Sequence, residues 1–126
     1  MLPEDDQQYL DEKGFAYEVI PDSGMVCVVI KGYLLPDGYA PQTTDLLLRL
    51  PAAYPDAAPD MYWCDPAVLY SNGVVPAASE LRESHLGRTW QRFSRHLAAG
   101  HWRSGTDGLQ SYLSLIRRDL QQNGSP

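Results

Sequence analysis

The stretch LRLPAAYPDAAPDMYW, residues 48–63, decides how the rest of this chain can be organised. An apolar run leads into Pro51, a Tyr-Pro pair ends at Pro55, and a second apolar run follows Pro59. Proline fixes φ and lacks a backbone donor, so these residues stiffen a crossing between two strands instead of lying inside one. The stretch therefore predicts two strands joined by a rigid connection, in which the tyrosine and the prolines have a structural role.

Upstream of this stretch, the sequence predicts one helix and then three strands. Residues 3–13 carry acids early and are followed by Gly14, which suits a short helix with a glycine stop. Strands are expected over residues 15–20, 25–35 and 43–51, the first two forming a hairpin around the turn PDSG. A fourth strand is expected at 61–66, directly after the proline-rich connection.

Downstream, the pattern fades over residues 67–105 and becomes clear again near the C-terminus. A long irregular connection in a compact domain is usually functional or mobile. Residues 107–120 predict a helix that Thr106 or Asp107 caps. One face of that helix carries an apolar stripe made of Leu109, Tyr112, Leu113, Ile116 and Leu120.

Together these elements predict an α+β fold of the order helix, four-stranded antiparallel meander, long irregular segment that holds the site, and helix. We expect a single domain over residues 1–120 and a flexible C-terminal tail over residues 121–126. Loops on a rigid scaffold are where sites concentrate, so the irregular segment is the place to search for function.

The composition of the chain argues against some classes of binding partner and indicates its location. The 126-residue chain has a net charge of −6 and no basic run, which argues against nucleic acid and anionic membranes as partners. The N-terminus is acidic and lacks the apolar region of a signal peptide, and no apolar run approaches the length of a membrane span. Two cysteines are too few for a disulfide scaffold, so we expect a cytoplasmic protein.

The proline-rich stretch resembles a stretch of the ubiquitin-conjugating enzymes, whose sheet has a Tyr-Pro…Pro segment between its third and fourth strands. The preceding GYLLPDGYAP, residues 32–41, resembles their Gly-Pro…Tyr loop. Trp102 and the striped helix after it are similar to their Trp-Ser-Pro segment and following helix. The chain resembles most closely the bacterial branch of that superfamily, which implies a ubiquitin-conjugating-like (UBC-like) fold.

The resemblance also implies partners. Bacterial members resemble parts of modification pathways that contain an activating enzyme, a ubiquitin-like protein and often a JAB-type isopeptidase. The activating enzyme would use ATP, so we expect no cofactor and no metal in this chain itself.

The resemblance places the nucleophile at a serine. In the family, the catalytic cysteine lies eight residues before the tryptophan that corresponds to Trp102, and in this chain that position is Ser94. Cys64 lies far upstream, directly after Trp63, and Cys27 lies inside a predicted strand. We expect both cysteines to be small apolar core residues and not nucleophiles.

The family's oxyanion-supporting residues are hard to find in this chain. Its His-Pro-Asn tripeptide is absent, and Asn72 is the only candidate for its asparagine. The link from Asn72 to Ser94 is much longer than the family's usual one. Gln91 is a further weak candidate, which donates either to backbone or to a developing oxyanion.

Two interpretations of Ser94 remain open. In one, the chain is a catalytically inactive binding module. In the other, Ser94 carries the acyl group as an oxyester instead of a thioester, and because a serine hydroxyl needs a base, a base must lie beside it. His96 is the candidate general base, since residues i and i+2 of an extended segment point to the same side.

The neighbouring residues have other readings. Trp90, Phe93 and Trp102 are expected to pack the segment down, and Arg92 and Arg95 are either a solvated face or a guide for a partner's C-terminal tail. A rival metal site would use His85, His96, His101 and Cys64, but their spacing matches no zinc motif. Ser94 also lacks the G-x-S-x-G context of a hydrolase elbow.

Overall fold

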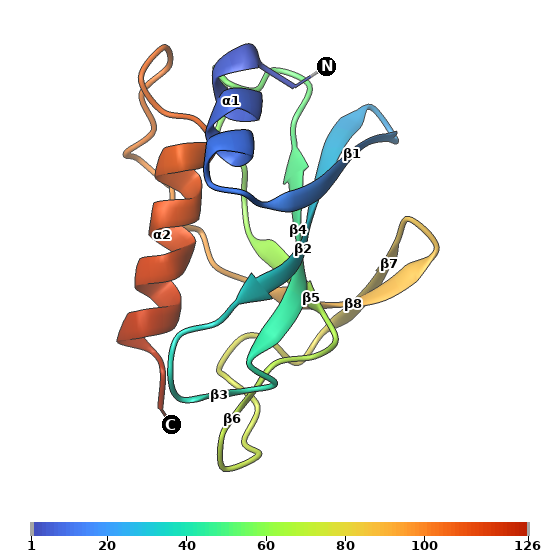
Figure 1. The fold of residues 1–126 in the computed structure, drawn as a ribbon, viewed down its shortest axis with the longest axis vertical. Helices are drawn as coiled ribbons and strands as arrows, with labels where there is room; N and C mark the ends of the chain where they lie inside the picture. Colours follow the sequence, from blue (N-terminus) through green and yellow to red (C-terminus); the bar gives the residue numbers. More distant parts are fainter. Residues whose placement is uncertain (1, 126) are drawn as a thin grey trace.

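A computed structural model describes residues 2–125 as an antiparallel sheet with two helices on one side (Figure 1). The sheet strands are β1 (Ala16–Asp22), β2 (Met25–Leu34), β4 (Thr43–Leu50), β5 (Tyr62–Asp65), β7 (Arg82–His85) and β8 (Arg88–Phe93). They lie in the order β1-β2-β4-β5-β8-β7. The helices are α1 (Glu4–Glu12) and α2 (Leu109–Gln122), and β3 (Tyr39–Ala40) pairs with β6 (Leu69–Tyr70) in a small second sheet. The predicted α+β class and both terminal helices are confirmed.

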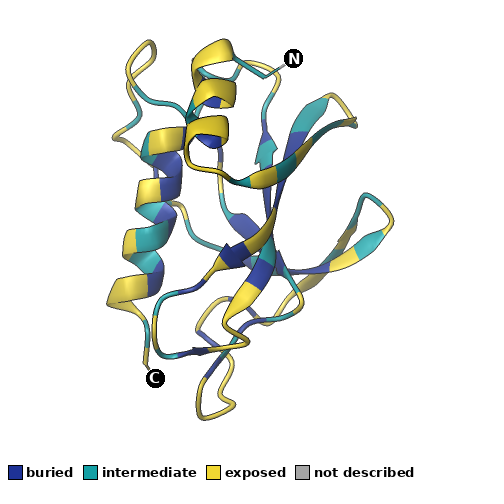
Figure 2. Ribbon diagram, in the orientation of Figure 1, coloured by how far each residue is buried: buried dark blue, intermediate teal, exposed yellow. Residues whose placement is uncertain are grey.

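The main core lies between α2 and the inner face of the sheet. The stripe of α2 is buried as its spacing predicts, and it packs on inner-face residues such as Val28, Leu48 and Phe93. Figure 2 shows α2 buried toward the sheet and exposed on its other side. Burial of this stripe, rather than helix propensity, is what holds a helix of this length in place.

The outer face of the sheet carries a second, smaller apolar cluster. It is made of Cys27, Val29, Leu47, Trp63 and Trp90, with Met61 and Leu86 packed against it. Successive side chains of a strand alternate between the two faces of the sheet. Since both faces are covered by apolar clusters, the central strands have uninterrupted apolar sequences.

The expected four-stranded meander was wrong in its strand count, because part of the irregular segment folds as the hairpin β7–β8. This hairpin adds two strands beyond β5. Its turn consists of Leu86 and Gly87, both with positive φ, as a two-residue hairpin turn requires. Leucine rarely adopts a positive φ, so the sequence does not indicate a turn at this place. The residues of β7 are charged or polar, so the sequence does not indicate a strand there either.

The N-terminus of α2 is capped from α1, so the expectation of a Thr106 or Asp107 cap was wrong. The carboxylate of Asp6 accepts from the backbone N–H of Leu109 at 3.0 Å and from the hydroxyl of Tyr54 at 2.6 Å. Asp107 instead accepts from the backbone N–H of Arg103. The tyrosine of the proline-rich stretch therefore has a structural role, since it holds the residue that joins the two helices.

The folded part of the chain extends beyond residue 120, where the flexible tail was expected to begin. Helix α2 continues through Gln122, and the carbonyls of Leu120 and Asn123 both accept from the hydroxyl of Tyr39 at 2.8 Å. Gly124 lies close against Gly38 in the loop before β3, where φ is +100° and an added Cβ would meet the Gly124 carbonyl. Residues 121–124 are thus part of the folded domain.

The two helices contain nine and fourteen residues. Within residues 2–125, neither is long and apolar enough to span a membrane.

Candidate active site at Ser94

Ser94 is the first residue after β8, where the chain leaves the sheet. Its backbone N–H donates to the carbonyl of Ala78 at 2.9 Å, and the N–H of Arg95 donates back to the carbonyl of Phe93 at 2.9 Å. The second of these bonds closes a three-residue turn. The serine is half-buried, and its backbone is fixed on both sides.

The register of the sheet sets the direction of the Ser94 side chain. Arg92 lies opposite Trp63 in the β5–β8 ladder and therefore shares the outer face with it. Phe93 points into the main core, and Ser94 returns to the side of Arg92. The guanidinium Nε of Arg92 donates to the Ser94 hydroxyl oxygen at 3.0 Å. The direct neighbour of this hydroxyl is thus a cation.

Arg92 is held in turn by Glu83 of β7. The Glu83 carboxylate accepts from Arg92 Nη1 at 2.7 Å and from Trp63 Nε1 at 2.8 Å, and it bonds His85 Nε2 at 3.1 Å. Partial burial opposes ionisation of Glu83, but the hydrogen bonds from His85, Trp63 and Arg92 outweigh it and lower its pKa. Glu83 therefore stays ionised and fixes the guanidinium from behind.

His96 lies near Ser94 in sequence but bonds a different residue. Its Nδ1 is 2.8 Å from a carboxylate oxygen of Asp60, and both side chains are exposed. Within residues 2–125, Ser94 and His96 share no hydrogen bond, because the chain turns at Ser94 and does not continue as the expected extended segment. The role of His96 as a base stays a prediction, and resting structures often lack such a contact.

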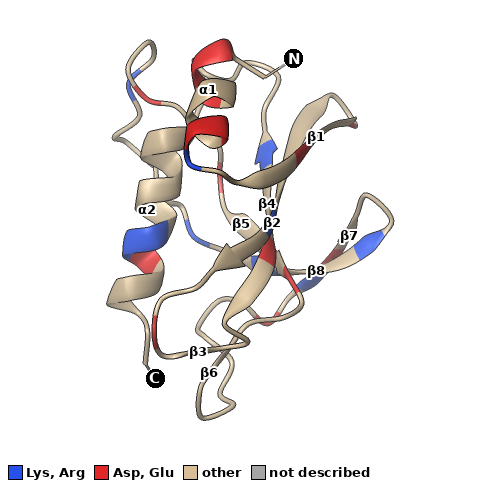
Figure 3. Ribbon diagram, in the orientation of Figure 1, with Lys and Arg blue, Asp and Glu red and all other residues tan. Residues whose placement is uncertain are grey.

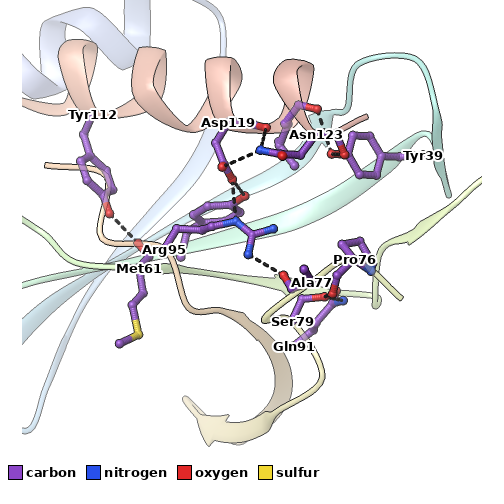
Figure 4. Close-up of polar contacts among 12 residues, drawn as sticks. Tyr39, Met61, Pro76, Ala77, Ser79, Gln91, Arg95, Tyr112, Asp119 and Asn123 are labelled. Atoms are coloured by element: carbon purple, nitrogen blue, oxygen red, sulfur yellow. Dashed lines mark hydrogen bonds and ion pairs between the residues drawn. The ribbon is translucent and has the colours of Figure 1, made fainter. Parts of the chain in front are cut away.

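The segment after Ser94 is tied to α2 by an ion pair. Figure 4 shows Arg95 between Asp119 of α2 and the backbone carbonyl of Ala77. Arg95 Nε lies 3.0 Å from Asp119, and this carboxylate also accepts from the hydroxyl of Tyr62 at 2.6 Å. Arg95 is thus neither a solvated face nor free to guide a partner's tail, since its side chain is only 14% exposed.

The two weak oxyanion candidates are engaged elsewhere. Asn72 stands in the turn after β6, and its side-chain oxygen accepts from the backbone N–H of Val74 at 3.0 Å. Gln91 is buried, and its amide group donates to the carbonyl of Val68 and to the hydroxyl of Ser79 while its oxygen accepts from the N–H of Val68. Of its two readings, the structure shows Gln91 donating to backbone.

Both cysteines are buried, as expected of core residues. Cys64 lies in the main core and Cys27 in the outer-face cluster. Burial raises the pKa of each thiol, which suppresses the thiolate that a nucleophile needs.

The rival metal site does not assemble. Cys64 faces the main core, whereas His85 contacts Trp63 on the outer face. Among residues 2–125, no three His, Cys, Asp or Glu side chains come close enough to hold a metal ion.

The surface has a groove whose lining includes Arg92, the side chain that bonds Ser94, and a larger cavity elsewhere. A groove of about 320 Å³ runs over the outer face and is lined by residues that include Met61, Trp63, Glu83 and Arg92. A larger cavity of about 850 Å³ lies between α1, α2 and the connection before α2, and its lining includes none of the residues bonded to Ser94. Acidic residues gather on α1, whereas arginines stand on β7 and β8 (Figure 3). We place the candidate site at the smaller groove because its lining includes Arg92, which bonds Ser94, and Glu83, which bonds Arg92.

Comparison with known proteins agrees with the resemblance seen in the sequence. The family model described as prokaryotic E2 family E matches residues 2–123, which include both helices, the whole sheet and Ser94. No curated protein and no solved structure matches the chain.

Proposed function

The chain belongs to prokaryotic E2 family E, and from this membership we propose that it acts in conjugation of a ubiquitin-like protein as an acyl carrier. Ser94 would accept the C-terminal acyl group of the ubiquitin-like protein from an activating enzyme and hold it as an oxyester. The protein would then pass the acyl group to an amine or hydroxyl of a target.

One observation carries this proposal. A half-exposed serine stands eight residues before Trp102, and its oxygen accepts a hydrogen bond from a guanidinium. Because that oxygen acts as the acceptor, its own hydrogen is available to a base. The chain offers no competing nucleophilic thiol at this place, since both cysteines are buried.

The Asp60–His96 pair supports the choice of base. A carboxylate bonded to Nδ1 holds an imidazole with Nε2 directed to accept a proton, which is the relation found in nucleophile–base–orienter sets. We propose that His96 approaches Ser94 when the acyl donor binds, and that Asp60 orients it. No cofactor of the chain's own takes part; ATP is spent by the activating enzyme.

A second function is favoured by one observation: among the described residues 2–125, no base is hydrogen-bonded to the Ser94 hydroxyl. In this alternative, the chain is an inactive UBC-like module that binds a ubiquitin-like protein or an activating enzyme and presents it. A JAB-type isopeptidase that reverses the modification is a proposed further partner in either case, and the cytoplasm is the proposed location.

The test is to mix the protein with its activating enzyme, its ubiquitin-like partner and ATP and to examine the product by denaturing electrophoresis. An oxyester on Ser94 should survive thiol reductants and break in hydroxylamine or mild base. Ser94→Ala should abolish the adduct, and Ser94→Cys should give an adduct that thiols cleave. Ser71→Ala, in the exposed turn after β6, is the matched control and should leave the adduct intact.

A different product would change the conclusion. A thiol-sensitive adduct that is lost in Cys64→Ser would identify another nucleophile. Intact partner binding without any adduct would select the binding module.

A further inference from the structure

We propose that Arg92 is a catalytic residue that stabilises negative charge on Ser94 and on the acyl group it receives, and that Glu83 positions Arg92. This inference rests on the proposed function, since it assigns a role in acylation of Ser94. It explains how a serine without a hydrogen-bonded base can be made reactive.

The contact geometry is that of an oriented cation. Arg92 Nε lies 3.0 Å from Ser94 Oγ, and Nη1 lies 2.7 Å from Glu83. Within residues 2–125, Nη2 makes no hydrogen bond, so the guanidinium keeps a donor edge for a carbonyl oxygen that arrives at Ser94. A planar guanidinium with fixed donors is suited to hold an oxyanion.

The backbone and its neighbours keep this guanidinium in place. The N–H of Arg92 donates to the carbonyl of Leu81 at 2.9 Å, and its side chain is 24% exposed. Glu83 receives donors from three different side chains, so it cannot swing away from Arg92 without leaving Trp63 and His85 unpaired. A preorganised donor does not have to reorganise during the reaction, which is why Glu83 contributes through Arg92.

Among the charged groups of this region, Arg92 has the strongest effect on ionisation of the Ser94 hydroxyl. Arg95 points toward α2 and is neutralised by Asp119, and Asp60 is bonded to His96. The other titratable and charged groups of this region are Glu83 and His85 of β7, which bond Arg92 or each other, and Arg95 and His96 of the following segment, which pair with Asp119 and Asp60. Of all these groups and Arg92, Arg92 alone bonds the hydroxyl oxygen, so the nearest charge favours its ionised form.

The acylation step balances without any oxidant or reductant. The bond from Ser94 Oγ to the C-terminal carbonyl carbon forms, and the bond from that carbon to its leaving group on the activating enzyme breaks. The serine proton passes to the base and in the net reaction to the leaving group, which is a phosphate or a side-chain oxygen or sulfur. Arg92 takes no proton; it stabilises the anionic oxygen that forms in between.

The first experiment measures the electrostatic effect without any partner protein. In Ser94→Cys, the pH dependence of alkylation by iodoacetamide reports the pKa of the introduced thiol, with mass spectrometry to locate the label. We expect a thiol pKa below the ordinary value of about 8.5. Adding Arg92→Gln should raise this pKa by about one unit or more, and Arg92→Lys should fall between the two. The buried Cys27 and Cys64 should stay unlabelled.

Arg88→Gln in the same Ser94→Cys background is the matched control. Arg88 stands on the same strand and carries the same charge, but it pairs with Asp45 and Asp65 instead of Ser94. Equal thiol pKa values with Arg92→Gln and with Arg88→Gln would overturn the assignment of Arg92. Thermal unfolding of each variant confirms that the compared proteins are folded.

The second experiment measures acylation of the native Ser94. Arg92→Gln should slow adduct formation by about 10²–10³-fold, the usual loss for one oxyanion donor. Glu83→Gln should slow it less and should move the pH profile in the same direction as Arg92→Gln. An adduct that forms at an unchanged rate in Arg92→Gln would refute the catalytic role while the proposed function stands. No adduct in the wild type would refute the proposed function and this role together, whatever the thiol pKa.

Discussion

Asp6 shows how much of the fold one carboxylate can hold. It is buried in α1, accepts from Tyr54 of the proline-rich connection, and caps α2 through Leu109. Gly108 permits this approach, because an added Cβ would lie 2.7 Å from the Asp6 carboxylate. One side chain thereby joins three segments that are far apart in sequence.

Asp6→Ala should therefore destabilise the protein strongly. It removes a helix cap, worth about 0.5–2 kcal/mol, and leaves the Tyr54 hydroxyl without a partner, at a cost of about 1–3 kcal/mol. We expect the free energy of unfolding in urea to fall by about 2–4 kcal/mol. The control is the exposed neighbour Asp5: Asp5→Ala should change the free energy of unfolding by less than about 0.5 kcal/mol. Equal losses in both variants would contradict the capping role.

Cys64 offers a second prediction at this scale. Cys64→Ser places a hydroxyl in the main core and should lower the free energy of unfolding by about 1–3 kcal/mol. The rate of acylation, measured below the melting temperature, should not change because the proposed acyl carrier is Ser94 and not this buried thiol. Cys64→Ala separates the hydroxyl from the lost volume and should leave acylation unchanged as well. A loss of the adduct in a folded variant would contradict this.

The site residues show which parts of a site a sequence reveals. Ser94 could be found because family motifs fix its distance from Trp102. The sequence predicts a solvated face or a guide for a partner's tail at Arg92 and misses its bond to Ser94, although the i and i+2 spacing of the two residues was the available signal. Glu83 could not be found, because its position depends on the pairing of β7 with β8, which the sequence hides.

At the scale of elements, the segment that carries Ser94 is bonded to a helix on one side and to the loop before β7 on the other. Arg95 reaches Asp119 of α2, and Ser94 reaches the carbonyl of Ala78. The helices and first strands could be predicted since each shows a clear 3.6- or 2-residue pattern. The hairpin β7–β8 shows neither, because β7 is an edge strand made only of charged and polar residues and β8 mixes arginines with its buried residues.

Asp119→Asn should loosen the fastening of this segment to α2. The ion pair is largely buried, and breaking such a pair by changing one partner costs about 3 kcal/mol or more. We expect faster backbone hydrogen exchange over residues 94–101 and slower acylation. Glu18→Gln, which breaks the exposed pair with Lys31, should cost less than about 1 kcal/mol and leave exchange there unchanged. Unaltered exchange in Asp119→Asn would show that the pair does not hold the segment.

At the scale of the whole molecule, the two faces of the sheet have different roles. The inner face packs on α2 and holds the main core, whereas the outer face holds the groove and the partners of Ser94. The inner interface also contains several tyrosines whose hydroxyl groups form hydrogen bonds that involve a residue of α1 or α2. These are Tyr39, Tyr54, Tyr62 and Tyr112.

These tyrosines predict that the protein unfolds in alkali. Burial, with the nearby Tyr70 and Asp119, raises the pKa of Tyr39 to about 12, and burial also raises the pKa of Tyr62 and Tyr112. An unfolded tyrosine titrates near pH 10, so above that pH the folded state binds more protons than the unfolded state. Stability is therefore fully present below about pH 10 and falls as the pH rises toward about 12.

Tyr39→Phe isolates one part of this effect. At neutral pH the variant should be less stable, because it loses the hydrogen bonds to the carbonyls of Leu120 and Asn123. Between about pH 10 and 12, however, its free energy of unfolding should fall less steeply than that of the wild type, by up to one proton's worth of slope. Urea titrations at stepped pH measure the slope, and tyrosinate absorbance follows the ionisation directly. A slope equal to that of the wild type would mean that Tyr39 ionises in the folded protein as it does in the unfolded chain, and that its bond to the end of α2 does not contribute to alkaline stability.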